Sequence, residues 1–326
     1  MTILLPLLGV AIISLVMWDL LITVFSASGA GVLTRAWTAP VWSGLLAVHR
    51  RHPVHRMLAL TGPAMVLVGI LLWYGLLAVG AFLVLNPHPS SVVRSSDRTP
   101  VDASNDAYFV GSTLSGLGYG DVVPSGFPWT IVSSVAALLG TIVLTTSLSY
   151  ILAVLTPAVQ RKSLASGVRV LGSSPSEIVE AAQLHDSSAS LQPFVTSLVT
   201  QLSDLTAKHL AFPVLGHFHS SHLASSPTRA VLLLSDATFL MGQRSGPDHP
   251  PAGLLKMLRG TIDDYAETKS GSSGTLPDHD VQRRHLRAEA ARLDIEIDGD
   301  YDAAETAYLG RRYRLLTLCD DDGWPL

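Results

Sequence analysis

Three long apolar segments constrain this chain more than any other feature of its sequence. Residues 1–26 hold a single side chain that is charged at neutral pH, Asp19, and residues 57–86 and 122–160 hold none. A helix needs roughly 20 apolar residues to cross the hydrocarbon core of a bilayer. The sequence therefore predicts three membrane-spanning helices. We expect the first to be retained rather than cleaved as a signal peptide, because it lacks a basic start and is longer than such segments usually are.

From about residue 161 the chain changes to Ser, Asp, Arg and His with short apolar patches. The net charge is −4 and no dense basic cluster is present, so we expect no nucleic-acid partner. The single cysteine, Cys319, excludes an intrachain disulfide and a cysteine-based zinc cluster. One half of the chain is thus predicted to lie in the membrane and the other in water.

Positive charges predict how the spans are oriented. The segments after the first and third spans are basic, whereas aspartates outnumber arginines between the second and third. Basic residues near membrane ends mark the cytoplasmic side. We therefore expect the N-terminus outside and the C-terminal half in the cytoplasm. The basic residues that carry this prediction are Arg35, Arg50, Arg51, Arg56, Arg161 and Lys162.

The segment between the second and third spans contains a run that suits neither a helix nor an ordinary strand. Residues 113–121 have the sequence TLSGLGYGD, with three glycines in five positions. Irregular backbone at membrane depth is tolerated only where it is buried in protein or lines a water-filled path. Glycine adopts backbone angles that can point successive carbonyls the same way, and a column of such oxygens can replace the hydration shell of a cation. One chain supplies one side of that column, so several copies are needed.

This run, with Pro124 behind it, resembles the pore loop and selectivity filter of the potassium-channel family, whose pattern is TxTTVGYGD followed by proline. The preceding stretch, residues 104–115, lies where that family has its short pore helix. The resemblance covers about residues 57–160. It implies an outer helix, a pore helix, a filter and an inner helix, assembled as a homotetramer that conducts K⁺.

Carried over by position, the resemblance implies filter residues whose carbonyls bind the ion, with Thr113, Asp121 and Tyr108 as supports. Asp121 lies where the family braces an aspartate from the pore helix, and because Ser112 occupies the usual partner's position, we expect Tyr108 to serve instead. Gly116 departs from the family's threonine and removes a hydroxyl from the innermost ion site. The filter residues are Gly116, Leu117, Gly118, Tyr119 and Gly120.

Two residues inside the spans have alternative interpretations. Gly140 lies where the family often has a hinge in the inner helix, and it equally suits close helix packing. Asp19 is costly inside a span. We expect it to have a structural role, either capping a helix or pairing with a nearby arginine. The third span is predicted to end at Pro157.

The C-terminal half is predicted to be helical, with a capping box at Ser174 and Glu177 and a flexible linker over residues 269–278. Further helices are expected near residues 191–209, 227–242, 251–267, 279–293 and 301–318. No nucleophile–base pair or phosphate loop is visible, so neither an enzyme nor a cofactor other than the permeant K⁺ is expected. Three histidines are weak candidates for a metal or proton sensor, although their spacing favours no metal site: His217, His219 and His222.

The sequence thus predicts an all-α membrane protein of the cell membrane, with a potassium-channel pore module, an extra N-terminal helix and an all-α cytosolic domain. We expect passive K⁺ conduction gated by an unknown signal, such as a cytosolic ligand. The alternatives are a weakly selective cation channel and a non-conducting membrane-anchored sensor. The expected parts are residues 1–26 (transmembrane helix), 27–56 (cytoplasmic linker with an interfacial helix), 57–160 (pore domain) and 161–326 (cytosolic domain).

Overall fold

The structure is a computed structural model, and it describes residues 3–26, 29–51, 55–183, 188–244, 250–268 and 279–324. By its internal contacts the chain divides into two units. The first consists of Met1–Val41 and Pro63–Val154, and the second of Trp42–Gly62 and Leu155–Leu326. Three helices in the described residues are long and apolar enough to cross a membrane, as the sequence predicts. The linker expected over residues 269–278 lies outside the described residues.

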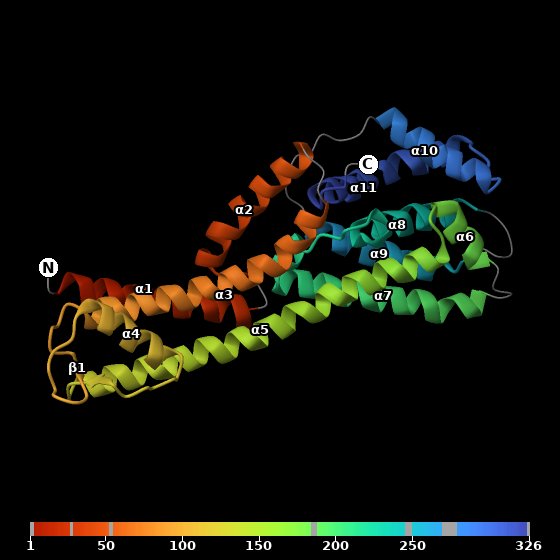
Figure 1. Ribbon diagram of the computed structural model, residues 1–326. Helices are drawn as coiled ribbons and strands as arrows, with labels where there is room; N and C mark the ends of the chain where they lie inside the picture. Colours follow the sequence, from red (N-terminus) through yellow and green to blue (C-terminus); the bar gives the residue numbers. More distant parts are fainter. Residues whose placement is uncertain are drawn as a thin grey trace. The chain divides into compact units, whose positions relative to one another are not determined.

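The first unit is built from the apolar helices and a short connecting region (Figure 1). In chain order its elements, some of which continue into the second unit, are α1 (Leu4–Phe25), α2 (Val32–Arg51), α3 (His55–Leu85), β1 (Val92–Arg94), α4 (Ala103–Leu114), β2 (Val122–Pro124) and α5 (Trp129–Leu171). Helices α1 and α3 pack through small residues, because a Cβ added to Gly9 would lie 2.5 Å from the Gly80 carbonyl oxygen. The helix expected within residues 27–56 is present as α2, and its interfacial position stays a prediction.

Asp19 of α1 caps the first turn of α2. Its carboxylate accepts hydrogen bonds from the backbone N–H groups of Leu33 (2.8 Å) and Thr34 (3.2 Å), from the Thr34 hydroxyl (2.7 Å) and from the Trp73 indole (2.9 Å). The residue before α2 is Gly31, which has no side chain to cap the helix. Asp19 therefore satisfies the free N–H groups from another helix. The capping interpretation is confirmed, and the arginine partner is wrong.

Replacing Asp19 with asparagine is expected to lower the free energy of unfolding in detergent micelles by about 2 kcal/mol. The side chain is 1% exposed. The amide group would place N–H donors against the donors that now face the carboxylate. Asp97→Asn is the matched control, because Asp97 is exposed and bonded only to Thr99. Equal destabilisation by the two variants, measured by thermal unfolding, would contradict the capping role.

The second unit is a helical bundle around one apolar core. Its helices are α6 (Pro175–Gln183), α7 (Ser188–Ala211), α8 (Pro227–Gln243), α9 (Ala252–Thr268), α10 (His279–Arg292) and α11 (Gly299–Asp321), with short 3₁₀ turns η1 (Pro213–His217) and η2 (Leu223–Ser225). Ser174 Oγ accepts from the Glu177 N–H at 3.3 Å, which is one half of the predicted capping box, whereas the Glu177 carboxylate accepts from the Ser173 N–H at 2.7 Å. The five further helices expected in this half are confirmed.

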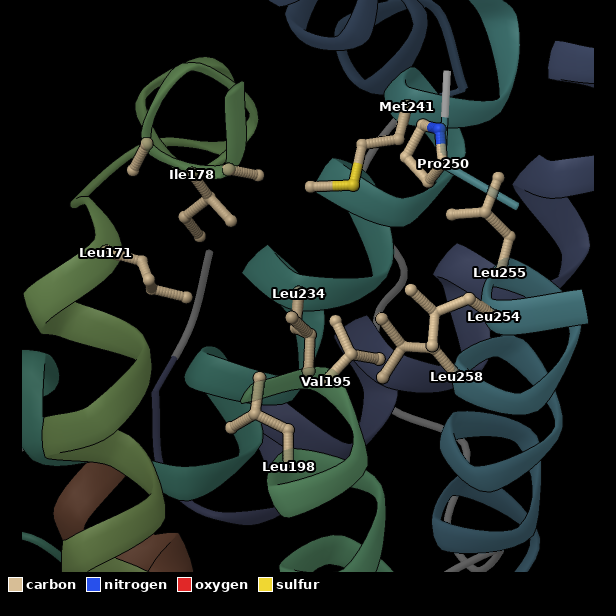
Figure 2. Close-up of a pocket in the computed structure, with 12 residues that line it drawn as sticks. Leu171, Ile178, Val195, Leu198, Leu234, Met241, Pro250, Leu254, Leu255 and Leu258 are labelled. Atoms are coloured by element: carbon tan, nitrogen blue, oxygen red, sulfur yellow. The ribbon is translucent and has the colours of Figure 1, made fainter. Parts of the chain in front are cut away.

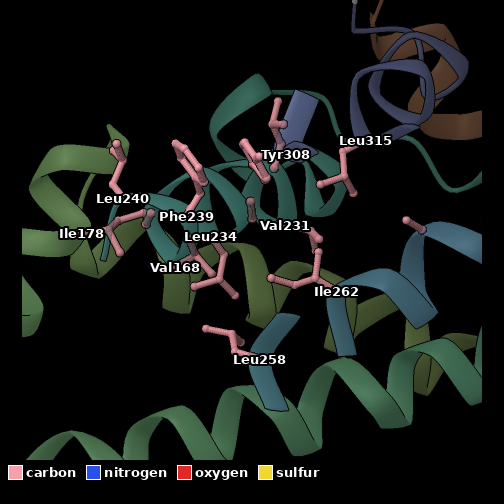
Figure 3. Close-up of a cluster of buried hydrophobic side chains, with 14 of the residues drawn as sticks. Val168, Ile178, Val231, Leu234, Phe239, Leu240, Leu258, Ile262, Tyr308 and Leu315 are labelled. Atoms are coloured by element: carbon pink, nitrogen blue, oxygen red, sulfur yellow. The ribbon is translucent and has the colours of Figure 1, made fainter. Parts of the chain in front are cut away.

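Helix α5 does not end at Pro157, so that prediction is wrong. The helix continues to Leu171 with Pro157 inside it. A proline inside a helix costs about 3 kcal/mol because it removes one hydrogen bond. Beyond it, α5 buries Leu164, Ala165 and Val168 in the core of the second unit. Figure 3 shows Val168 within this cluster. A fully buried leucine or valine side chain such as those of Leu164 and Val168 contributes about 1.5–3 kcal/mol, which offsets the lost bond.

An apolar cavity of about 100 Å³ lies between the end of α5 and helices α6 to α9. Figure 2 shows Ile178, Leu234, Met241 and Leu258 among the side chains around it. On the other side of α8, the buried ion pair between Arg312 Nε and Asp236 Oδ1 (2.9 Å) joins α8 to α11. Tyr308 donates to the same carboxylate oxygen at 2.6 Å.

Candidate functional site

Helix α4 is fixed at both ends between α3 and α5 (Figure 1). At its start, Asp102 Oδ1 accepts from the backbone N–H of Asn105 at 3.0 Å. The side chain of Asn86, just after α3, donates to Asp106 of α4 at 3.2 Å. The last turn ends at Leu114, with the Ser115 N–H bonded to the Gly111 carbonyl. The C-terminus of α4 therefore lies directly at the start of the glycine-rich run.

The glycines of the run have left-handed backbone angles at alternate positions. The φ angle is +75° at Gly116, +57° at Gly118 and +83° at Gly120. An L-residue with a side chain avoids this region, whereas glycine occupies it without steric penalty. The backbone of this run therefore requires glycine at each of the three positions of the GxGxG pattern.

The amide groups of the run show which way its carbonyls point. The N–H groups of Leu117 (3.0 Å) and Gly118 (3.3 Å) both donate to the Ser112 carbonyl at the end of α4. A trans peptide unit places its C=O opposite its N–H. The carbonyl oxygens of Gly116 and Leu117 therefore point to the same side, away from α4. No residue of the described chain donates a hydrogen bond to the carbonyls of residues 116–119.

The outer end of the run is held by a small sheet and by an aromatic side chain. Strands β1 and β2 pair antiparallel, and Ser95 N donates to the Asp121 carbonyl at 2.8 Å. The Tyr108 hydroxyl of α4 donates to Asp121 Oδ1 at 3.1 Å, and its ring stacks on that of Tyr119 with centroids 6.0 Å apart. The Ser112 hydroxyl bonds to the Phe109 carbonyl instead. The sequence did not predict the two three-residue strands.

Gly140 of α5 lies against the C-terminus of α4. A Cβ added to Gly140 would overlap the backbone of Leu114, lying 2.7 Å from its Cα. The inner helix therefore supports the end of α4 at a point where only glycine fits. The hinge role assigned to Gly140 stays a prediction.

Comparison with known proteins shows which family the region around the glycine-rich run resembles. Residues 66–156 match the family model described as ion channel. These residues are an ion channel domain. The match spans α3 from Val66 onward, the sheet, α4, the glycine-rich run and α5 as far as Thr156. The support interactions described above all belong to this domain or to its immediate flanks.

The chain is also similar to an uncharacterized membrane protein of Bacillus subtilis (strain 168), YdjJ. The two are 29% identical over 247 residues, which cover 76% of this chain and 72% of the relative. The similarity is longer than the ion channel domain, so it takes in a large part of the remaining chain. No solved structure matches the chain. The spans, the domain and this relative together identify an all-α membrane protein.

The three histidines singled out in the sequence do not meet. His217 lies against Trp42, with ring centroids 5.0 Å apart, and His222 is exposed. His219 instead stacks on His55 and Trp324 at 5.4 and 5.0 Å, with the His49 ring 6.0 Å away. Spacing along the chain could not indicate His49 and His55, which come from the ends of α2 and α3. No group of metal-ligating side chains is found among the described residues.

The contacts of His219 indicate which tautomer its neutral ring adopts. Its Nδ1 lies 2.6 Å from the Asp322 carbonyl and must donate, because a carbonyl only accepts. Its Nε2 then accepts from His55 Nδ1 at 3.2 Å. The titratable groups that act on His219 are Asp322, His55 and His49, and the Asp322 carboxylate also pairs with Arg161 at 3.6 Å. Burial lowers the pKa of His219 from 6.5 to about 4.

We expect this histidine to make the folded protein acid-sensitive. The unfolded chain binds a proton near pH 6.5 and the folded chain only near pH 4, so stability is lost as the pH falls between these values. The loss in unfolding free energy should be roughly 2 kcal/mol. The measurement is the unfolding temperature from pH 7.5 to 4.5. His219→Asn should flatten the profile and His222→Asn should not; identical profiles would refute the assignment.

Proposed function

We propose that the protein is a potassium-selective channel formed by four copies of this chain. The observation that carries the proposal is the backbone of residues 116–120. Left-handed glycines alternate along it, and the carbonyls of Gly116 and Leu117 face the same side without a donor from the described chain. Such oxygens offer a dehydrated cation the ligands that its water shell would otherwise supply.

The one-sided geometry of the run supports assembly of several chains, and we propose four because the resemblance to the potassium-channel family implies a tetramer. One run supplies oxygens on one side only, and a closed ring requires cyclic symmetry. Leu117 and Tyr119 are 61% and 65% exposed in the single chain. In the proposed assembly, neighbouring chains would cover these large side chains. In the assembly, the C-terminus of each α4 would direct the negative end of its helix dipole towards the central axis, which favours a cation.

The proposed orientation follows the basic residues. Arginines near α2 and directly after the apolar part of α5 favour a cytoplasmic location for those regions, and we propose that the N-terminus and the segment between α3 and α5 lie outside. Ions would then pass from one side to the other down their electrochemical gradient. No bond of a substrate is made or broken in this process, so we propose a channel and not an enzyme.

Gly116 favours a second candidate function, that of a weakly selective cation channel. Glycine offers a carbonyl but no hydroxyl to the innermost ion site. We expect Gly116→Thr to raise the preference for K⁺ over Na⁺ severalfold, since one extra oxygen ligand is worth about 1 kcal/mol. The cost is that threonine must adopt φ +75° or shift the run. Relative permeability in planar bilayers measures the effect. An unchanged ratio with normal conductance would exclude a role for position 116.

The proposal is tested by ion flux from liposomes that contain the purified chain. Efflux should be rapid for K⁺ and slower for Na⁺, and empty liposomes should show neither. Flux of both ions at similar rates would support the weakly selective channel. Protein that inserts as a tetramer but passes no ion under any internal pH or divalent-ion condition would favour a non-conducting sensor and overturn the proposal.

A further inference from the structure

A second cavity of the C-terminal unit differs in character from the apolar one. It has a volume of about 270 Å³ and lies between α8, α9 and α11. Two of the residues that line it are arginines, Arg259 and Arg311, and none is acidic. A cavity with guanidinium groups in its wall and no carboxylate is electrostatically suited to an anion.

The two arginines differ in their partners. Arg311 makes two bonds to Asp263, from Nε at 2.5 Å and from Nη2 at 2.8 Å. Asp263 is also approached by Arg314 at 3.9 Å, so this carboxylate already faces two cations. Arg259 has no acceptor among the described residues, and neither has the side chain of Gln243 beside it in the cavity wall. The cavity therefore holds an uncompensated positive charge and unused N–H donors.

Gly242 of α8 makes room for the Arg259 guanidinium. A Cβ added at this position would overlap Nη2 of Arg259. The guanidinium thus lies close over the backbone of α8, next to Gln243. Because α8 and α9 both contribute residues to the packed core, the fold brings the backbone positions of Gly242 and Arg259 together.

The remaining wall is apolar and aromatic. Phe239 and Tyr308 stack with centroids 4.5 Å apart and an interplanar angle of 7°, and Ile262 lines the cavity from α9. The hydroxyl of Thr238 is engaged with the Leu234 carbonyl at 2.6 Å. The cavity therefore offers free polar donors at Arg259 and Gln243, and apolar surface elsewhere.

We propose that this cavity binds a small organic anion. Its carboxylate or phosphate group would accept hydrogen bonds from Arg259 and Gln243, and its apolar part would pack against Phe239 and Ile262. This site lies in the second unit, outside the ion channel domain, and its occupancy does not depend on the channel proposal. Two oxygens of a carboxylate or a phosphate can accept parallel hydrogen bonds from the forked guanidinium, which explains an arginine here rather than a lysine.

The test is isothermal titration of the full chain in detergent with three probes, namely phenyl phosphate, benzoate and inorganic phosphate, at constant ionic strength set with NaCl. We expect saturable binding of phenyl phosphate or benzoate, and weaker binding of inorganic phosphate, which lacks the apolar part. Whichever organic probe binds more tightly identifies the oxyanion as phosphate or carboxylate.

Arg259→Gln should weaken binding at least about tenfold. Lys256→Gln removes the same charge from an exposed position on the same helix and should leave binding unchanged. If Arg259→Gln fails to fold, Gly242→Ala serves in its place, because it keeps the charge and displaces the guanidinium. Absence of saturable binding for all three probes, or equal losses in the Arg259 and Lys256 variants, would overturn the proposal.

Discussion

Replacing Gly118 with alanine is expected to reduce ion flux by more than about tenfold. Gly118 has φ +57°, and holding an alanine in that region costs about 1–2 kcal/mol per chain. In a ring of four chains the cost is incurred four times. The run would relieve the strain by rotating peptide units, and the carbonyl of Leu117 would then no longer point away from Ser112. A barrier higher by 1.4 kcal/mol is enough for a tenfold slower passage.

Gly111→Ala is the matched control for this variant. Gly111 lies in α4, where alanine is favoured, and an added Cβ meets no atom within 4 Å. Liposome flux should therefore persist in Gly111→Ala and disappear in Gly118→Ala, with both proteins inserting normally. Full conduction by Gly118→Ala would show that the backbone at this position does not line the ion path.

Replacing Gly140 with alanine is expected to destabilise the first unit, although helix propensity alone predicts the opposite. Alanine in a helix interior is normally better than glycine by about 1 kcal/mol. At Gly140 the methyl group would overlap the backbone of Leu114, which cannot move aside as a flexible side chain can. The end of α4 and the run that follows it must shift, so we expect lower thermal stability and reduced flux together.

Gly75→Ala is the control that separates the effect of the steric overlap at Gly140 from the effect of helix propensity. Gly75 lies inside α3, and an added Cβ meets no atom within 4 Å. This variant should unfold at the same temperature as the parent or slightly higher. If Gly140→Ala behaves like Gly75→Ala in thermal unfolding and in flux, then the contact between α5 and α4 does not support the run as we describe.

The elements that the sequence predicted well have local causes. Absence of charge over about 30 residues is enough to indicate a span, and capping residues with apolar periodicity indicate the helices after residue 174. The left-handed glycines follow from residue type, because few other residues adopt those angles. We expected Tyr108 to brace Asp121 because Ser112 occupies the position where the potassium-channel family has the usual partner. The hydrogen bond between Tyr108 and Asp121 is present.

What the sequence did not predict depends on contacts between distant segments. Pro157 is a local stop signal, but burial of the following turns overrides it. Strands β1 and β2 are three residues long, too short to show an alternating pattern. The partners of Asp19 and His219 come from helices elsewhere in the chain, so neither spacing nor composition could name them. The ion-binding role of residues 116–120 stays a prediction.

The most direct test of the central claim is the reversal potential of the purified channel in a planar bilayer with K⁺ on one side and Na⁺ on the other. If the carbonyls of Gly116 to Tyr119 from four chains coordinate a dehydrated K⁺, the reversal potential will follow the K⁺ gradient and stay there when the Na⁺ concentration is changed. A reversal potential near zero under these conditions, with robust current, would contradict the account.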